Sequence, residues 1–297
     1  MQLGGEVGTV RPPRADFWGV SQRMISNWSN LLARRDLLRE LTVSELRARS
    51  QETSFGWVWW LVDPLIMMLI YWAVVVGIFG RGANYTPYPV FILCALLPWK
   101  HFTGGLGSCS RILRNRDTLI KSIAFPTMVL PLTVVAAGFS NFLFGLVVLV
   151  GTAFAFGLPL GLPLIQIPLL MGLQLCLVTG LCLAASCAGA LVRDLSGFLG
   201  HLTRIGFYVA PSLYGIDMVE KRFLKGALGD LPGAEHALTI YLLNPFATLI
   251  TGYREAIFYD RFMQAEYWAL LTVESLVLLI VGYRVYQYFD RRVIKFL

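Results

Sequence analysis

Charged side chains are scarce in this sequence. Asp, Glu, Lys and Arg make up 14% of its 297 residues, whereas hydrophobic residues make up 56%. A water-soluble domain carries about 25% charged residues, because its surface must be kept in solution. The composition therefore excludes an ordinary soluble fold and predicts a membrane protein. A chain of this length fits one membrane domain of about six spans.

The sequence also lacks the common motifs of catalysis, metal binding and nucleotide binding. Its three histidines have no metal-ligand spacing, and its five cysteines form no CxxC pair, so we predict no metal or cofactor bound by this chain. It contains no GxxxxGK[ST] phosphate-binding loop, so ATP-driven work would need an ATPase on another chain. A membrane-embedded glycosyltransferase or acyltransferase would need paired acids or a His–acid set, and none is evident. An ion-coupled flippase would need charged pairs buried within its spans, and the sequence gives no sign of them.

Long apolar stretches are what the sequence has in abundance. Such stretches are long enough to cross a bilayer as helices. The predicted spans are, approximately, residues 57–79, 90–107, 127–157, 165–191, 197–216 and 267–286. We therefore predict an all-α membrane protein with six transmembrane helices, in a transmembrane domain that covers residues 57–290.

The ends of the chain differ from the apolar segments between them. Residues 1–21 contain glycine and proline and predict a mobile tail. Residues 22–56 mix leucine with charged residues, which predicts an amphipathic helix on the membrane surface; a solvated helix on a soluble partner is the alternative. Within this region Thr42 and Glu45 fit a capping box, at which a second helix would begin. Residues 291–297 predict a short tail.

Basic residues are distributed unevenly among the loops. The N-terminal region, the 109–125 loop, the turn at Arg193 and the C-terminal tail hold many of them on one side, whereas the short loops on the other side hold only Arg81. By the positive-inside rule, both termini are cytoplasmic. The net charge of +7 then suits an anionic membrane face, and we predict no nucleic-acid partner.

Cations and aromatic residues lie within or beside the predicted spans. The two cations, Lys100 and Arg204, either extend toward the membrane interface or face an internal path for an anionic substrate. The aromatic side chains either pack within the membrane or stack on sugar rings along such a path. The candidate path residues are Tyr71, Trp72, Tyr88, Trp99, Lys100, Arg204, Tyr208 and Tyr214. The sequence leaves both alternatives open.

Five segments of the sequence, taken in order, resemble one transporter family. They are RARSQETSFGWVWWLVDPLI, YTPYPVFILCALLPWKHF, NRDTLIKSIAFPTMVLPL, LVRDLSGFL and LLNPFATLITGYREAIF. Together they resemble the permease subunits of ABC-2-type polysaccharide exporters, which export O-antigen, teichoic acid and capsule. Each segment alone matches the family only weakly, but the order and spacing of all five over residues 30–290 are more specific.

The resemblance implies an assembly and a function. The chain would form a homodimer in the bacterial inner membrane, and two copies of an ABC ATPase would bind ATP and Mg on its cytoplasmic side. This transport subunit, not itself an enzyme, would move a lipid-linked polysaccharide across that membrane. An ABC-2 permease for a lipid or a drug is the alternative within transport, and a membrane-embedded glycosyltransferase or acyltransferase is the alternative outside it.

The resemblance also implies roles for particular residues. The 109–125 loop would contain a cytoplasmic coupling helix, and the alternative is that its charges serve orientation alone. Residues 217–266 would form an outer gate. Arg47 and Arg49 would meet the pyrophosphate of the lipid-linked glycan, because arginine pairs with phosphate through two hydrogen bonds. The residues expected to contact the ATPase are Arg114, Asn115, Arg116, Asp117 and Leu119.

Overall fold

The protein is a bundle of helices. The computed structural model describes residues 35–51, 55–56, 58–80, 85–122, 127–225 and 239–296. The helices are α2 (Arg35–Gln51), α3 (Val58–Trp72), η1 (Ala73–Ile78), α4 (Tyr88–Asn115), α5 (Asp117–Ser122), α6 (Val129–Ala155), η2 (Leu162–Gln166), α7 (Ile167–Leu191), α8 (Leu195–Val209), α9 (Ile216–Lys225), α11 (Pro245–Ile257) and α12 (Ala265–Phe296). The described residues contain no β-strand, which confirms the predicted all-α fold.

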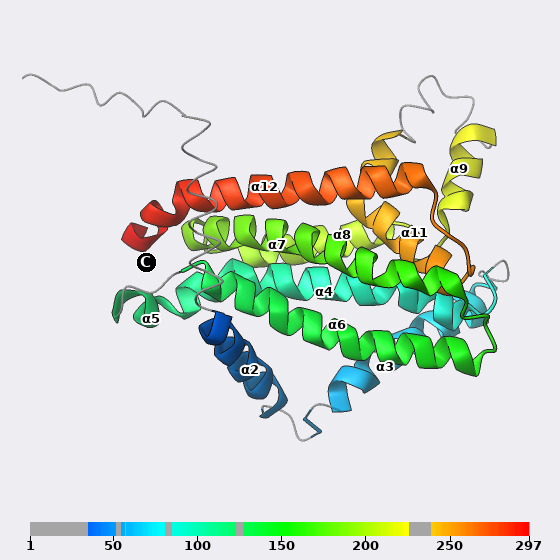
Figure 1. The fold of residues 1–297 in the computed structure, drawn as a ribbon, viewed down its shortest axis with the longest axis horizontal. Helices are drawn as coiled ribbons and strands as arrows, with labels where there is room; N and C mark the ends of the chain where they lie inside the picture. Colours follow the sequence, from blue (N-terminus) through cyan, green and yellow to red (C-terminus); the bar gives the residue numbers. More distant parts are fainter. Residues whose placement is uncertain are drawn as a thin grey trace, which may run out of the picture.

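The long helices lie side by side and define two ends of the bundle (Figure 1). α5 and the C-terminal end of α12 lie at one end, which we name the α5 end. α9 and α11 lie at the opposite end, named the α11 end (Figure 1). The described part of α2 lies nearer the α5 end, so the segments rich in basic residues gather there.

Five segments of the described chain are long and apolar enough to cross a membrane. They are Val58–Ile78, Tyr88–Asn115, Val129–Ala155, Leu162–Leu191 and Ala265–Phe289. The prediction of a sixth long span at 197–216 is wrong, because α8 has only 15 residues and is about 22 Å long. α8 ends at Val209 because Pro211 follows, which favours the extended backbone seen at Ala210 (φ −64°, ψ 152°).

α8 nevertheless connects the two ends of the bundle. Just before it, the carbonyl of Arg193 accepts a hydrogen bond from Arg114 near the α5 end. Just after it, the carbonyls of Pro211 and Ser212 accept hydrogen bonds from Arg254 of α11. α8 and the turn after it therefore supply the remaining pass between the two ends.

Two helices continue beyond the predicted spans into charged sequence. α4 runs to Asn115 instead of ending near 107, and α12 runs to Phe296 where a tail was predicted from 291. Thr42 does not cap a second helix, because its hydroxyl donates to the carbonyl of Leu38 at 2.7 Å within a continuous α2. Arginine and lysine are good helix formers, so charge alone does not end a helix. The predicted tail, residues 1–21, and residues 22–34 lie outside the described chain.

Close contacts among α4, α6, α7 and α12 form the centre of the bundle, which we name the core. In the most hydrophobic 18-residue stretch of α4, 72% of the residues are buried, whereas the share for Val58–Ile78 is 11%. α3 therefore lies at the side of the bundle. α7 packs most extensively against α12. A Cβ atom on Gly180 or Gly282 would collide with the backbone of the facing helix, so glycine permits this close approach.

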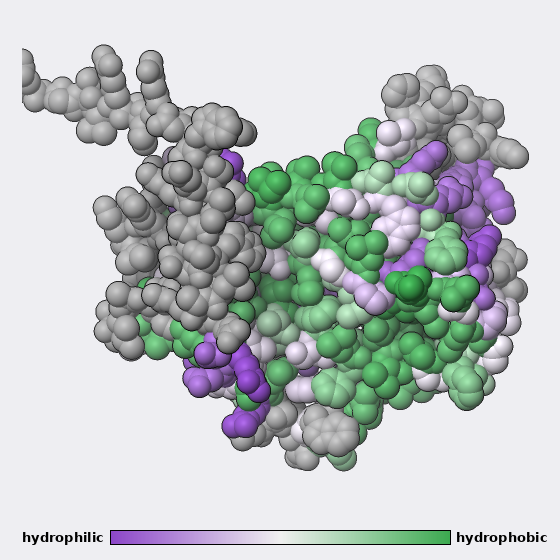
Figure 2. Space-filling model, in the orientation of Figure 1, coloured by the Kyte–Doolittle hydropathy of each residue, from purple (hydrophilic) through white to green (hydrophobic). Residues whose placement is uncertain are grey.

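Apolar side chains cover the middle of the face shown in Figure 2, and hydrophilic ones gather near α2 and near α9. Exposed apolar residues include Ile66, Leu69 and Ile70 on α3 and Phe198 and Ile205 on α8. An apolar belt between polar ends is what a bilayer requires of the surface in contact with it.

The predicted connection at 217–266 contains a buried helix. α11 has 13 residues, most of them buried, and packs against α4, α7 and α12. Asn244 begins it as an N-cap, because its side chain accepts a hydrogen bond from the amide of Phe246 at 3.1 Å. α11 therefore enters the bundle but is too short to cross it.

Candidate functional site

A groove between α3, α4 and α8 brings candidate path residues together. Its volume is about 410 Å³. Aromatic rings and two cations from distant parts of the chain share it. Five of the eight candidates line it: Tyr71, Trp99, Lys100, Arg204 and Tyr208. We refer to this space as the groove.

The other three candidates do not line the groove. Trp72 is 45% exposed on the outer surface of α3. Tyr88 is buried, and its hydroxyl donates to the carbonyl of Leu213 at 3.1 Å. The Tyr214 hydroxyl lies within hydrogen-bond distance of the carbonyls of Tyr208 and Val209. Tyr88 and Tyr214 therefore hold the end of α8, which fits the packing alternative for these two aromatics.

An ion pair within the membrane spans forms part of the groove. Lys100 of α4 pairs with Asp63 of α3, and their side chains are 52% and 39% exposed. The sequence predicts no charged pair buried within the spans, and this pair is partly exposed. Asp63 was missed as a site residue. The available signal was an acid and a base, each in one of two consecutive spans.

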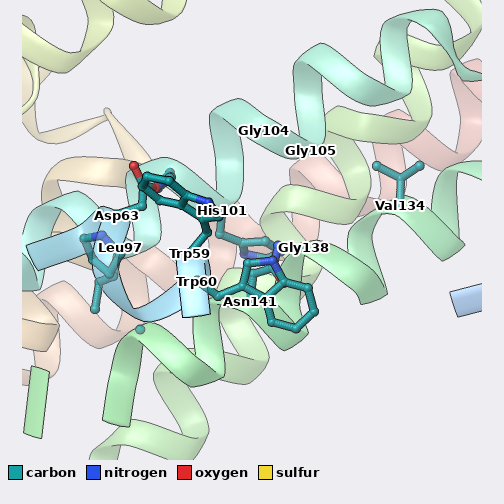
Figure 3. Close-up of a pocket in the computed structure, with 13 residues that line it drawn as sticks. Trp59, Trp60, Asp63, Leu97, His101, Gly104, Gly105, Val134, Gly138 and Asn141 are labelled. Carbon is teal, nitrogen blue, oxygen red and sulfur yellow. The ribbon is translucent and has the colours of Figure 1, made fainter. Parts of the chain in front are cut away.

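A second cavity lies on the other side of this ion pair. It is lined by residues of α3, α4 and α6, has a volume of about 320 Å³, and shares Asp63 and Lys100 with the groove. Figure 3 shows Trp60, His101 and Asn141 around it. The Oδ1 atom of Asn141 is buried and has no hydrogen-bond partner among the described residues. The ion pair thus lines both the groove and this cavity.

A buried hydrogen-bonded chain ties α11 to the core. Tyr253 of α11 donates to Oε1 of Gln174 at 2.7 Å, and Nε2 of the same amide lies 2.8 Å from Nδ1 of His101. The other ring nitrogen of His101 lies 3.4 Å from the carbonyl of Val135. These side chains hold helices α4, α6, α7 and α11 in register, because an unmatched polar group would be costly there.

The five candidate coupling residues lie at or next to α5. The Arg114 side chain donates to the carbonyl of Arg193 at 3.0 Å, and Arg116 lies 3.7 Å from Glu45 of α2. Asp117 accepts a hydrogen bond from the amide of Thr118 at 2.7 Å, at the start of α5. Asn115 is exposed. The junction of α4 and α5 therefore contacts both α2 and the turn before α8.

A small apolar cluster anchors α5 to the core. Leu119, the fifth candidate, packs against it and is half-buried. The hydroxyl of Tyr286 in α12 adds a hydrogen bond to Thr127 at 2.9 Å. A displacement of α5 would therefore reach α7 and α12 directly. The cluster contains Leu113, Ile120, Leu130, Leu183, Cys187, Tyr283 and Tyr286.

The two arginines predicted to meet a pyrophosphate lie on α2. Arg47 is exposed in a shallow depression that also contains Asp36 and Glu40. The side chain of Arg49 lies outside the described part of the structure. Of the two arginines, Arg47 therefore lies near acidic side chains as well as basic ones.

Comparison with curated proteins identifies relatives along most of the chain. No family model matches it. The O-antigen export system permease protein RfbA of Myxococcus xanthus is 29% identical over 247 residues, covering 82% of this chain and 89% of that protein. A protein of the same name from Klebsiella pneumoniae is 28% identical over 255 residues, covering 85% and 91%.

The chain is a homologue of O-antigen export permeases. A second Klebsiella pneumoniae protein of that name, 27% identical over 255 residues, agrees with this assignment. The resemblance to ABC-2-type polysaccharide permeases is thereby confirmed. The groove, α5 and α11 accordingly lie in a chain that is similar to permease proteins of O-antigen export systems.

Proposed function

We propose that this chain is the transmembrane subunit of an ATP-driven exporter that moves a lipid-linked polysaccharide across the bacterial inner membrane. The groove carries this proposal. Aromatic side chains can stack on sugar rings, and Lys100 and Arg204 can balance the charge of a pyrophosphate. Arg47 and Arg49 on α2 would meet the same pyrophosphate before it enters the groove.

A second copy of the chain would cover the groove. The apolar faces of α3 and α8 are exposed on both sides of it, and Arg204 is exposed between them. An arginine at the centre of a lipid-facing helix costs about 2.5–3.5 kcal/mol. A homodimer that joins these faces would keep Arg204 away from lipid and enclose the groove.

The α5 end is the proposed cytoplasmic side, where both termini and two ATPase subunits would lie. ATP and Mg would bind those subunits. Closure of the ATPase pair would push α5, and the apolar cluster beside it would carry the movement into α7 and α12. The core would then move relative to α3 and α8 and widen the groove. α9 and α11 would form the outer gate.

Purification with the partner ATPase tests the proposal. ATP hydrolysis by the complex should rise when the strain's lipid-linked glycan is added, and Arg204→Leu and Lys100→Met should lower this stimulation. The control is Arg284→Leu, at an exposed arginine of α12 outside the groove. Unchanged stimulation in folded Arg204→Leu and Lys100→Met proteins would refute the role of the groove.

The same assay separates the alternatives. A lipid or drug permease would respond to phospholipid or drug and not to the glycan lipid. The Asp63–Lys100 pair makes an ion-coupled exporter a further alternative. Such an exporter would transport without any ATPase partner.

A further inference from the structure

A polar pocket opens at the α11 end, away from the groove. Its volume is about 470 Å³, and it shares no lining residue with the groove. Side chains from α9, from α11 and from the segments before α4 and after α11 surround it. Those with polar groups are Tyr85, Asp217, Lys221, Thr251, Arg254, Glu255, Tyr259 and Arg261. We name this space the outer pocket.

Hydrogen bonds to the backbone hold the inner wall of the outer pocket in place. Arg254 is 2% exposed and donates hydrogen bonds to the carbonyls of Pro211, Ser212 and Tyr214. The Tyr85 hydroxyl donates to Asp217 at 2.9 Å and accepts from the amide of Gly215 at 3.1 Å. Burial raises the pKa of this hydroxyl.

Four of the five charged side chains in the outer pocket form two pairs, and the fifth, Arg254, donates to backbone carbonyls. Asp217 lies 3.8 Å from Lys221, and Glu255 lies 3.2 Å from Arg261. The pKa of Glu255 is raised by burial and lowered in part by Arg261 beside it. An anion in this pocket would meet two carboxylates, and a cation would meet three basic side chains. The pairing therefore favours a neutral ligand that both donates and accepts hydrogen bonds.

Aromatic surface completes this chemistry. The ring of Tyr259 lies in the wall and stacks with the Arg261 guanidinium at 4.7 Å. Carboxylates accept from hydroxyl groups, guanidinium and ammonium groups donate to them, and an aromatic face covers the C–H side of a sugar ring. A neutral polyhydroxylated ring satisfies all of these groups together.

One segment of the chain contributes residues to both the groove and the outer pocket. α8 lines the groove with Gly200, Arg204 and Tyr208, and the chain that continues from α8 lines the outer pocket with Gly215 and Asp217. The two spaces are thus joined along one segment of the chain.

We propose that the outer pocket binds uncharged sugar units of the exported glycan as they leave the groove. This inference rests on the proposed function, because only a glycan exporter would present such a ligand here. Asp217 and Glu255 accept from sugar hydroxyls, Lys221 and Arg261 donate to them, and Tyr259 contacts the ring.

Calorimetric titration of the full chain in nanodiscs tests the inference. The probe is the strain's O-polysaccharide, released from lipid by mild acid. Glu255→Gln and Asp217→Asn should each weaken its binding about tenfold, the effect of losing one hydrogen bond to a charged group. The matched control, Glu266→Gln, removes an exposed acid at the start of α12 outside the pocket and should bind as the wild type does.

A further variant guards against misfolding. Lys221 is 76% exposed, so Lys221→Gln leaves the buried packing intact and should still weaken binding severalfold. Undiminished binding by Lys221→Gln together with the two acid variants would overturn the inference. So would the absence of any binding by the wild type, or displacement of the polysaccharide by millimolar phosphate or calcium.

Failure of this inference is distinguishable from failure of the proposed function. If deletion of the gene abolishes surface polysaccharide while the polysaccharide does not bind the chain, only the outer pocket assignment fails. If surface polysaccharide persists after deletion, the proposed function fails.

Discussion

Arg254 ties α11 to the segment that follows α8, and its replacement by leucine should loosen that connection. Its guanidinium donates to the carbonyls of Phe91, Pro211, Ser212 and Tyr214 at 2.5–3.3 Å. It also lies 3.6 Å from the centre of the Phe91 ring. Leucine retains apolar volume but supplies none of these hydrogen bonds.

The loss can be sized from these contacts. A hydrogen bond to a charged group contributes about 1.5–3 kcal/mol, and a buried carbonyl left without a donor is costly. The four contacts share one guanidinium group, so their contributions are not simply additive. We expect Arg254→Leu to lower the free energy of unfolding by about 3–5 kcal/mol, the range typical of breaking a buried charged contact.

Thermal unfolding of the purified protein in detergent measures this effect. For a domain of this size, 1 kcal/mol shifts the midpoint by about 2–4 °C, so a fall of about 10 °C is expected. Arg254→Lys should lie between wild type and Arg254→Leu, because lysine keeps the charge but not the planar fork or the ring stacking. Arg284→Leu, at an exposed position, should have little effect. A midpoint for Arg254→Leu within about 2 °C of wild type would refute the reasoning.

Three further predictions follow from the packing and the polar contacts. Gly282→Leu should abolish a single folded peak in size-exclusion chromatography, because its side chain has no room against Gly180, whereas Gly151→Leu points into open space and should elute normally. Tyr253→Phe should cost about 1–3 kcal/mol in denaturant unfolding, because Gln174 loses its 2.7 Å donor, and Tyr208→Phe at a site 57% exposed should cost much less. Arg116→Glu should change stability by less than about 1 kcal/mol, since its pair with Glu45 is partly exposed, but should reduce ATPase recovery in co-purification; full recovery would argue against α5 as the docking element.

The spans could be predicted because hydropathy records the membrane directly. Long apolar stretches located α3, α4, α6, α7 and α12, although their ends were misplaced where helices continue into charged sequence. The length of α8 was predictable in principle, because Pro211 stands inside the apolar stretch and disfavours helix at Ala210. A hydropathy average over many residues hides a single proline, whereas that proline still ends the helix.

The side-chain contacts of the site were less accessible from the sequence. Hydrophobicity marked Lys100 and Arg204 as unusual, and both line the groove. Asp63 was missed because its role depends on which face of α3 meets α4, and that rotation is set by packing across the helices. Burial of Arg254 was equally hidden, because its partners are backbone carbonyls and carry no sequence signature.

The unequal packing of the bundle gives the proposed transport cycle a physical basis. α7 meets α12 through glycines with no spare room, so these helices can move only together. α3 has few buried residues and joins α4 partly through the ion pair of Asp63 and Lys100, whose side chains are partly exposed. A push at α5 enters the closely packed side through the apolar cluster. Because the groove lies along the boundary between the closely packed core and the exposed helices, relative movement of the two would change its width without disturbing either.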